Sequence, residues 1–536
     1  MSAPASSSRR EAALSAAALA AWIGLMIAAS PPWTAVPVGD DWIYAGSVKT
    51  LLSTARLRVS EFAAPTALTH ILWGTLFCLP AGFSQAALRT STLAAAGLAL
   101  FFFERLLAEL GQPPSRRRIG AALLALNPLF VSAALSFYTD AFFLAAFLLS
   151  ALGVLKGSRR WLWAASAASI AATLARQIGL APAAAGAVWR WRRGDRGGAM
   201  ILLVPPLAAL AAHSLWFTRV HGVTHAAWYH AHESLARLAS PAALAKDALF
   251  RFSAAVALIG LAVFPLGASA AFSPSEIKRP ASSRAVVLAA VAAAWAAALA
   301  AGLLPPRLGD ELWFGGLGPA AVPGAAFKTA GWWGWRALWN AADAASLLAL
   351  LGLAATQAPA GGTIFLAAAS ALAFAPAFLS FSYYDRYVLV LLPAAIAAGL
   401  DAAAENPRAA WLGAALMGIL SWCGARDAAS WNAALWRAAA KLESLGYCAE
   451  EIRGGLSWDG AHEAEKNIAI LRRTTPLSQI KPYAWLELEH PRALLTFDPR
   501  PPRGTRRLFV ERYPTPLSLG GGAIYADALE PGVRPP

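Results

Sequence analysis

The chain has 536 residues, of which 58% are hydrophobic and 14% are charged, and its mean hydropathy is +0.50. A soluble domain is usually about 45–50% apolar and about 25% charged. The composition therefore excludes a soluble globular protein and predicts an all-α polytopic membrane protein. The net charge of +15 does not indicate nucleic-acid binding, because most basic residues cluster between apolar segments, as they do in cytoplasmic loops. The three cysteines have neither metal-ligand spacing nor the spacing of a disulfide framework.

The apolar segments predict about 13 membrane crossings, because roughly 20 apolar residues span the hydrocarbon core of a bilayer. The first segment follows Arg9 and Arg10 and lacks a small-residue cleavage site, which indicates a retained helix and not a signal peptide. The predicted crossings are residues 11–30, 88–108, 119–136, 141–156, 161–176, 178–190, 199–217, 247–270, 284–304, 341–357, 363–380, 387–404 and 409–424.

Residues 66–83 are also apolar, but a crossing there would place the basic cluster 116–118 outside the membrane. Short cytoplasmic loops carry an excess of Lys and Arg. We therefore interpret residues 66–83 as a juxtamembrane or re-entrant helix within an outer loop, 31–87. This topology puts the N-terminus inside and the C-terminus outside. Irregular backbone at membrane depth is tolerated only where protein or a water-filled cavity covers it, so a pocket is predicted beneath this helix.

The composition changes near residue 425, where charges, prolines and short alternating stretches begin. Residues 1–424 are predicted to form the transmembrane domain, and residues 425–536 a small α/β domain on the outer side. In the latter, a helix is expected over 431–445, strands are expected near 493–497, 508–513 and 523–526, and residues 499–503 are expected to form a Pro-rich connection.

An acidic pair, Asp40 and Asp41, follows the first predicted helix. Carboxylates are costly near hydrocarbon, so such a pair is a candidate functional site. These groups could activate a hydroxyl or amine acceptor, or bind a cation. The alternative interpretation is a solvated loop in which Asp40 caps a helix over 41–52.

Two further polar sites fall on the same outer side. Asp140 lies in the aromatic and apolar stretch 137–143. It can be interpreted as a functional acid or as a helix cap. Arg176, followed by Gln177, stands at the outer end of an Ala- and Leu-rich helix, where a guanidinium suits an anionic group such as a phosphate. The alternative for Arg176 is extension of its side chain to the membrane interface.

Three aromatic or His-rich stretches complete the outer side. In residues 383–387, Arg386 and Tyr384 are candidate contacts for a lipid phosphate. The alternative interpretation is that Arg386 pairs locally with Asp385. Residues 332–336 are Trp-rich and suit an interface anchor. Histidines in and near the loop 220–233 make a divalent-cation site an open alternative, although paired ligand spacing is lacking; they are His213, His221, His225, His230 and His232.

In their order along the chain and their predicted side of the membrane, these motifs resemble those of the GT-C membrane glycosyltransferases. They are most similar to the dolichyl-phosphate-mannose-protein mannosyltransferase-like group, which includes the lipid A aminoarabinose transferase. The stretch Asp40-Asp41-Trp42-Ile43-Tyr44 resembles the Asp-Glu-x-x-Tyr pattern of that group, with Asp in place of Glu. The likeness covers roughly residues 1–424.

The resemblance implies catalytic roles for Asp40, Asp41 and Asp140, with Asp40 as the principal acid. It implies substrate or phosphate contacts for Tyr44, His70, Arg176, Gln177, Tyr384 and Arg386. Arg176 stands where the aminoarabinose enzyme has a Lys. The re-entrant segment of that enzyme begins with Lys-Pro, whereas this chain has Ala64-Pro65 with His70 nearby, so the phosphate contact of that Lys must come from elsewhere.

The resemblance implies an inverting glycosyltransferase of the bacterial inner membrane. The expected partners are a polyprenyl-phosphate-sugar donor, a glycan, lipid or protein acceptor on the outer face, and membrane lipids. The sequence predicts no specific cofactor, and a divalent cation stays an open alternative. A polytopic transporter or lipid-linked-sugar flippase is the alternative, but it would favour midplane charges and internal repeats, which the sequence lacks. A membrane scaffold for the outer domain is a second alternative, which would not need the acidic pair.

Overall fold

The computed structural model describes residues 5–271 except 65, residues 361–530 except 381, 382, 402–405, 489 and 517–520, and residues 293, 297, 312, 313, 316, 317 and 322. The predicted crossings 284–304 and 341–357 and the Trp-rich stretch 332–336 lie outside the described residues, apart from 293 and 297. A short antiparallel pair, β1 (Leu312–Trp313) and β2 (Gly316–Leu317), is described within this region.

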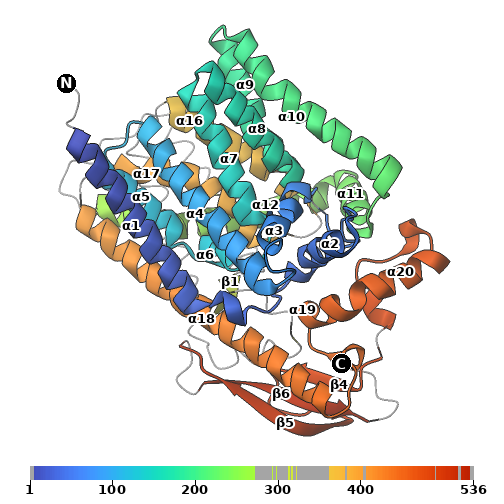
Figure 1. The fold of residues 1–536 in the computed structure, drawn as a ribbon. Helices are drawn as coiled ribbons and strands as arrows, with labels where there is room; N and C mark the ends of the chain where they lie inside the picture. The colour runs from blue at the N-terminus through green and yellow to red at the C-terminus, as the bar shows by residue number, and fades with distance from the viewer. Residues whose placement is uncertain are drawn as a thin grey trace.

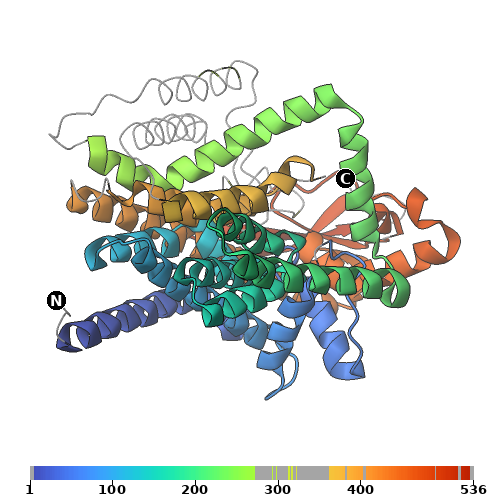
Figure 2. The same ribbon diagram turned by 90° about the horizontal axis from the view of Figure 1, so that it is seen from above.

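Most of the described chain is a bundle of helices with a small sheet at one end (Figure 1). Six helical segments among the described residues are long and apolar enough to cross a membrane. This confirms the prediction of an all-α polytopic membrane protein, while the number of about 13 crossings stays a prediction. Figure 2 shows α1 and α12 on opposite sides of the bundle. The six segments overlap α1 (Ala5–Ala29), α4 (Gln85–Glu109), α7 (Thr139–Lys156), α10 (Arg196–Trp216), α12 (Pro241–Ala271) and α16 (Gly361–Phe374).

Small residues let the helices of the bundle approach closely. In α7, a Cβ atom on Gly153 would lie 2.6 Å from the Trp161 carbonyl oxygen and 2.8 Å from the Ala165 Cβ atom of α8 (Arg159–Ala175). Only glycine therefore fits where α7 crosses α8. Such small-residue contacts are typical of helix packing in membranes.

Several predicted crossings in the described part of the chain are not continuous α-helices. The segment 119–136 is divided into α5 (Pro114–Ala125) and α6 (Pro128–Ala134), because Pro128 cannot donate a backbone hydrogen bond and Asn127 instead caps the second helix. The segment 387–404 begins with the 3₁₀ helix η5 (Asp385–Leu391) and continues as α17 (Leu392–Gly399).

The helix predicted within residues 66–83 is α3 (Leu68–Cys78), which has 11 residues. At 1.5 Å per residue it spans about 16 Å, roughly half of a hydrocarbon core. It packs along the bundle through hydrogen bonds from the Thr69 hydroxyl to the Ala171 carbonyl (2.6 Å) and from the Trp73 indole to the Ser91 carbonyl (2.9 Å). Its length favours the juxtamembrane or re-entrant interpretation.

The C-terminal region forms a four-stranded sheet of order β3-β4-β6-β5, as part of the small α/β region that the sequence predicts. The 38-residue helix α18 (Pro407–Ser444) runs without a break through the predicted domain boundary at residue 424, and its second half packs on the sheet (Figure 1). The strands are β3 (Ile452–Arg453), β4 (Ala493–Thr496), β5 (Thr505–Tyr513) and β6 (Gly522–Leu529).

The C-terminal region also contacts α2 (Asp41–Thr54), the helix that follows the acidic pair. A Cβ atom on Gly460 would lie 2.2 Å from the Trp42 indole, so the backbone there lies directly against the ring. Glu465 accepts a hydrogen bond from the Glu61 backbone (3.1 Å), and Arg472 forms an ion pair with the Glu61 carboxylate. The sheet region is thereby joined to the loop that carries Asp40.

Candidate active site

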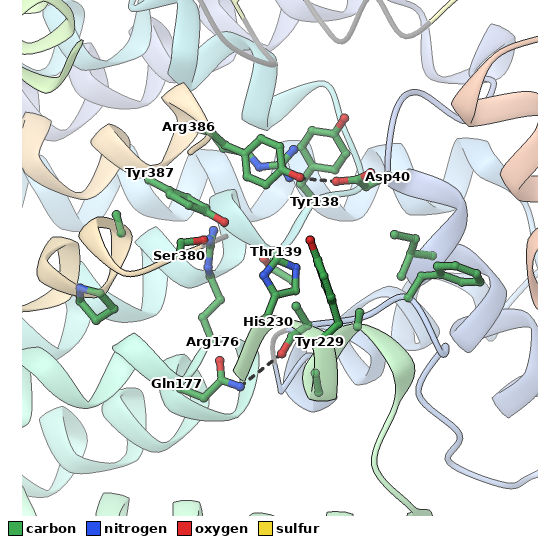
Figure 3. Close-up of a pocket in the computed structure, with 18 of the residues that line it drawn as sticks. Asp40, Tyr138, Thr139, Arg176, Gln177, Tyr229, His230, Ser380, Arg386 and Tyr387 are labelled. Atoms are coloured by element: carbon green, nitrogen blue, oxygen red, sulfur yellow. Dashed lines mark hydrogen bonds and ion pairs between the residues drawn. The ribbon is translucent and has the colours of Figure 1, made fainter. Parts of the chain in front are cut away.

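A cavity of about 650 Å³ lies where the bundle meets the loop 31–87 and the C-terminal region. Its walls come from the beginnings of α2 and α7, the 3₁₀ helices η2 (Gln177–Leu180) and η5, the helix α11 (His225–Leu238) and residues 482–485 (Figure 3). Seven of the nine predicted site residues line it, namely Asp40, Tyr44, Asp140, Arg176, Gln177, Tyr384 and Arg386.

Asp40 stands at the N-cap position of α2, but its side chain makes no capping hydrogen bond. Its carboxylate instead accepts a hydrogen bond from Nη2 of Arg386 at 2.9 Å (Figure 3). The cap interpretation of Asp40 is therefore wrong. Gly39, with a φ of 51°, provides the left-handed turn that leads the chain into α2.

Asp41 points the other way and does not line the cavity. It is completely buried, where it accepts a hydrogen bond from the Val38 backbone (3.2 Å) and lies 3.5 Å from Nη2 of Arg89. Burial raises the pKa of Asp41 to about 7, against the opposing effect of Arg89. Of the two adjacent acids, the structure thus brings only Asp40 to the cavity.

His70 is also buried outside the lining of the cavity. Its ring packs on that of Phe137 with centroids 4.3 Å apart, and its Nε2 atom lies 3.3 Å from the Phe137 carbonyl oxygen. It packs edge-on against Tyr44, which does line the cavity. The position of His70 supports the wall and gives it no direct access to a bound phosphate.

Asp140 lies in the first turn of α7, where the positive end of the helix dipole favours a carboxylate. The N-cap of that helix is Tyr138, so Asp140 is not a cap. It forms an ion pair with Arg176, and its second oxygen lies 3.9 Å from Nε of Arg386. Only 6% of its side chain is exposed.

Arg176 ends α8 in an extended conformation, and the chain then turns into η2. The turn needs Gly179, because a Cβ atom there would lie 2.2 Å from the carbonyl carbon of Ala172. Arg176 is held by Asp140 and is only 14% exposed, so the interpretation that it extends to the membrane interface is wrong. Gln177 donates to the Ala64 carbonyl at 3.4 Å, which ties η2 to the outer loop (Figure 3).

The four charged residues form one continuous chain, in the order Asp40, Arg386, Asp140 and Arg176. Its formal charge is zero, and it brings together segments that lie more than 300 residues apart in sequence. In a partly buried cavity such pairs are only weakly screened by solvent. An incoming anion would have to displace a carboxylate from one of the two guanidiniums.

Aromatic rings fix both guanidiniums. The guanidinium carbon of Arg386 lies 4.5 Å from the ring centroids of both Tyr138 and Tyr384. That of Arg176 lies 5.3 Å from the centroid of Tyr387. Cation–π contacts of this kind hold a cation in place without using its hydrogen-bond donors. The N–H groups of both arginines are thus oriented by the protein before any ligand binds.

The sequence indicated the His-rich loop 220–233 as an open cation site, but it did not predict that α11 and the C-terminal region line the cavity. On α11, Ala226, His230 and Ser234 recur every fourth residue on the face toward the cavity, with Tyr229 beside them. This spacing was a usable signal. Nothing in the sequence indicated Tyr483 and Trp485 as lining residues.

The histidines of this loop have other partners. His221 Nε2 accepts from the Val59 backbone (2.9 Å), His225 Nε2 faces the Ile480 carbonyl (3.2 Å), and the exposed His232 stacks on Trp228. Among the residues that the structure describes, no group of three His, Cys, Asp or Glu side chains is placed to hold a metal ion.

No family model matches the chain, and no curated protein matches its sequence. The chain is similar to two solved structures of ArnT from Cupriavidus metallidurans, a GT-C aminoarabinose transferase. The structure bound to undecaprenyl phosphate is 12% identical, with a TM-score of 0.44, and the match covers 98% of this chain and 99% of that chain. The apo structure is 15% identical, with a TM-score of 0.38, over 88% of this chain and 74% of that chain.

Proposed function

We propose that this protein is a membrane glycosyltransferase that moves a sugar from a polyprenyl phosphate to an acceptor hydroxyl on the outer face of the cell membrane. The observation that carries the proposal is the chain of ion pairs from Asp40 to Arg176 in the cavity. It combines two oriented guanidiniums for a phosphate with a carboxylate that can accept a proton. The order of the outer motifs, which resembles that of GT-C enzymes, supports the same assignment.

In the reaction, the acceptor oxygen attacks C1 of the sugar from the side opposite the phosphate. The C1–O bond to the phosphate breaks, and its electron pair stays on the phosphate oxygen. Arg176 and Arg386 stabilise the charge that develops there, so no strong acid is needed to assist departure. The acceptor proton passes to Asp40, and the configuration at C1 is inverted.

Phosphate binding would also free Asp40. Its carboxylate is bonded to Arg386 at 2.9 Å. When a phosphate oxygen takes over the guanidinium, the Asp40 carboxylate is released toward the acceptor hydroxyl. Donor binding thus positions the base for the acceptor.

The proposal is tested by mass spectrometry of surface glycans and lipid-linked sugars in a strain of the source organism that lacks this protein. We expect one glycan to lose a sugar and a polyprenyl-phosphate form of that sugar to accumulate. The accumulated lipid then serves as donor for the purified wild-type protein in detergent, with membranes of the deletion strain as acceptor.

Transfer in detergent distinguishes a glycosyltransferase from a transporter or flippase, because the latter two have no function where no bilayer divides the solution. We expect transfer by the wild-type protein and by the control variant Asp401→Asn, which alters an ion pair outside the cavity. We expect no transfer by Asp40→Asn. An unchanged glycan profile in the deletion strain, or no transfer by the wild type, would refute the proposal.

A further inference from the structure

The cavity has two chemically different walls. One carries the ion-paired residues Asp40, Arg386, Asp140 and Arg176. The other, which we call the α11 wall, consists of hydrogen-bonding and aromatic side chains without formal charge; its members are Tyr229, His230, Ser234, Tyr483 and Trp485. In Figure 3 the rings of Tyr229 and His230 project into the cavity from α11, below Asp40 and Arg386.

The α11 wall is held in place by contacts behind it. The Glu61 carbonyl accepts from the Ala226 backbone (2.9 Å), and the Glu61 carboxylate accepts from the His225 backbone (2.9 Å), which fixes the start of α11. His225 Nε2 faces the Ile480 carbonyl and therefore donates to it (3.2 Å). This bond joins α11 to the segment that carries Tyr483. Both parts of the wall are thus fixed relative to the loop that holds Asp40.

The α11 wall offers no cation to a ligand. Among the described lining residues, Arg176 and Arg386 are the only Lys or Arg side chains, and both belong to the other wall. Burial lowers the pKa of both His225 and His230, which keeps the two imidazoles neutral at pH 7. A donor phosphate that occupies the two arginines leaves no positive charge in this lining for a second anion.

We infer that the α11 wall binds the acceptor, and that the acceptor is an uncharged carbohydrate with free hydroxyl groups. This inference rests on the proposed function. Hydroxyl groups can bond to the His230 imidazole and the Ser234 hydroxyl, and the flat faces of Tyr229 and Tyr483 suit the C–H faces of sugar rings. A phosphate or carboxylate on this wall would lose its hydration without gaining a cation.

The linkage formed in the cell tests the class of acceptor. The glycan that changes in the deletion strain is purified, and NMR together with tandem mass spectrometry identifies the atom that carries the missing sugar. We expect a hydroxyl oxygen of an uncharged sugar residue. A sugar attached to a phosphate, to a phosphorylated lipid or to a peptide would overturn the inference and leave the proposed function intact. A strain with no changed glycan would refute the proposed function itself.

Kinetics of variants test the wall. The donor is the lipid that accumulates in the deletion strain, and the acceptor is the glycan purified from it. We expect His230→Ala and Tyr483→Ala each to raise the KM for acceptor about tenfold, with the KM for donor unchanged. His232→Ala, on the same helix but exposed and outside the lining, is the matched control.

Tyr483 is 54% exposed, so its replacement leaves folding intact even if the His230 variant proves unstable. Equal acceptor KM values for wild type, Tyr483→Ala and a stable His230→Ala would overturn the inference, as would an effect on the donor KM alone. Because wild-type transfer is measured in the same assay, these failures are distinct from failure of the proposed function.

Discussion

Replacement of Arg176 is expected to affect folding and donor binding by separable mechanisms. Arg176 is the partner of Asp140, whose side chain is only 6% exposed and whose other charged neighbour, Arg386, lies 3.9 Å away. Arg176→Ala leaves that carboxylate buried with Arg386 at 3.9 Å as its remaining charged partner. Removal of one partner of a buried pair usually costs about 3–5 kcal/mol, and the remaining contact with Arg386 should reduce this loss to about 2–3 kcal/mol.

A second substitution isolates the effect on binding. In Arg176→Ala/Asp140→Asn the unpaired charge is gone, so most of the lost stability should return, as measured by the Tm of the purified protein in detergent. Binding of a polyprenyl phosphate should not return with it. The loss of a buried charge-assisted contact to phosphate costs about 2–5 kcal/mol, which corresponds to a rise in Kd of roughly 30-fold to several-thousand-fold.

The assay is titration of the purified variants with a polyprenyl phosphate in detergent, with Arg116→Ala as control. Arg116 also forms an ion pair, with Asp401, but neither residue lines the cavity. The double variant must be compared with Asp140→Asn alone, so that the contribution of the acid is subtracted. A stable double variant that binds as tightly as Asp140→Asn would show that Arg176 only neutralises Asp140, and would refute its role as a phosphate ligand.

Three further predictions concern other parts of the chain. Asp40→Asn should lower turnover by about two to four orders of magnitude with little change in Tm, and Asp41→Asn should lower it less. Full activity of a folded Asp40→Asn protein in the transfer assay would end the assignment of Asp40 as the base. The exposed Cys448 should react with an impermeant thiol reagent in intact cells when Cys78 and Cys423 are replaced by Ser, whereas labelling only after permeabilisation would place the C-terminal region inside. Burial raises the pKa of Asp459 to about 7, so the folded state retains a proton that the unfolded chain loses near pH 4, and stability is lost as the pH rises from about 4 to about 7. Asp459→Asn keeps an acceptor for the Gly454 N–H (2.7 Å) and should therefore have a higher Tm than wild type at pH 8 but not at pH 4. A difference in Tm that does not depend on pH would contradict this prediction.

The sequence predicted the charged residues of the cavity because charge is rare and costly in an apolar chain. Asp140, Arg176 and Arg386 each stand at the end of an apolar segment, and all three line the cavity. Their pairing was beyond prediction, since the sequence suggested only a local protein partner for Arg386. Asp385 does accept a hydrogen bond from the Arg386 backbone (2.9 Å), but the guanidinium also contacts Asp40, 346 residues away. The α11 wall was missed for a different reason. His230 and Tyr229 are common interfacial residues, and only the position of the helix in the fold distinguishes a cavity lining from a membrane interface.

The beginning of α2 shows why the two adjacent acids could not be distinguished from sequence. Asp40 precedes the first helical residue of α2 and faces the cavity, whereas Asp41 begins the helix and faces the packed interior. There it lies against Arg89 of α4, while the next residue, Trp42, packs on the Gly460 backbone of the C-terminal region. Three successive residues therefore contact three different parts of the protein. Because the orientation of α2 is fixed by Asp41 and Trp42, the C-terminal region contributes to the position of Asp40 without touching it.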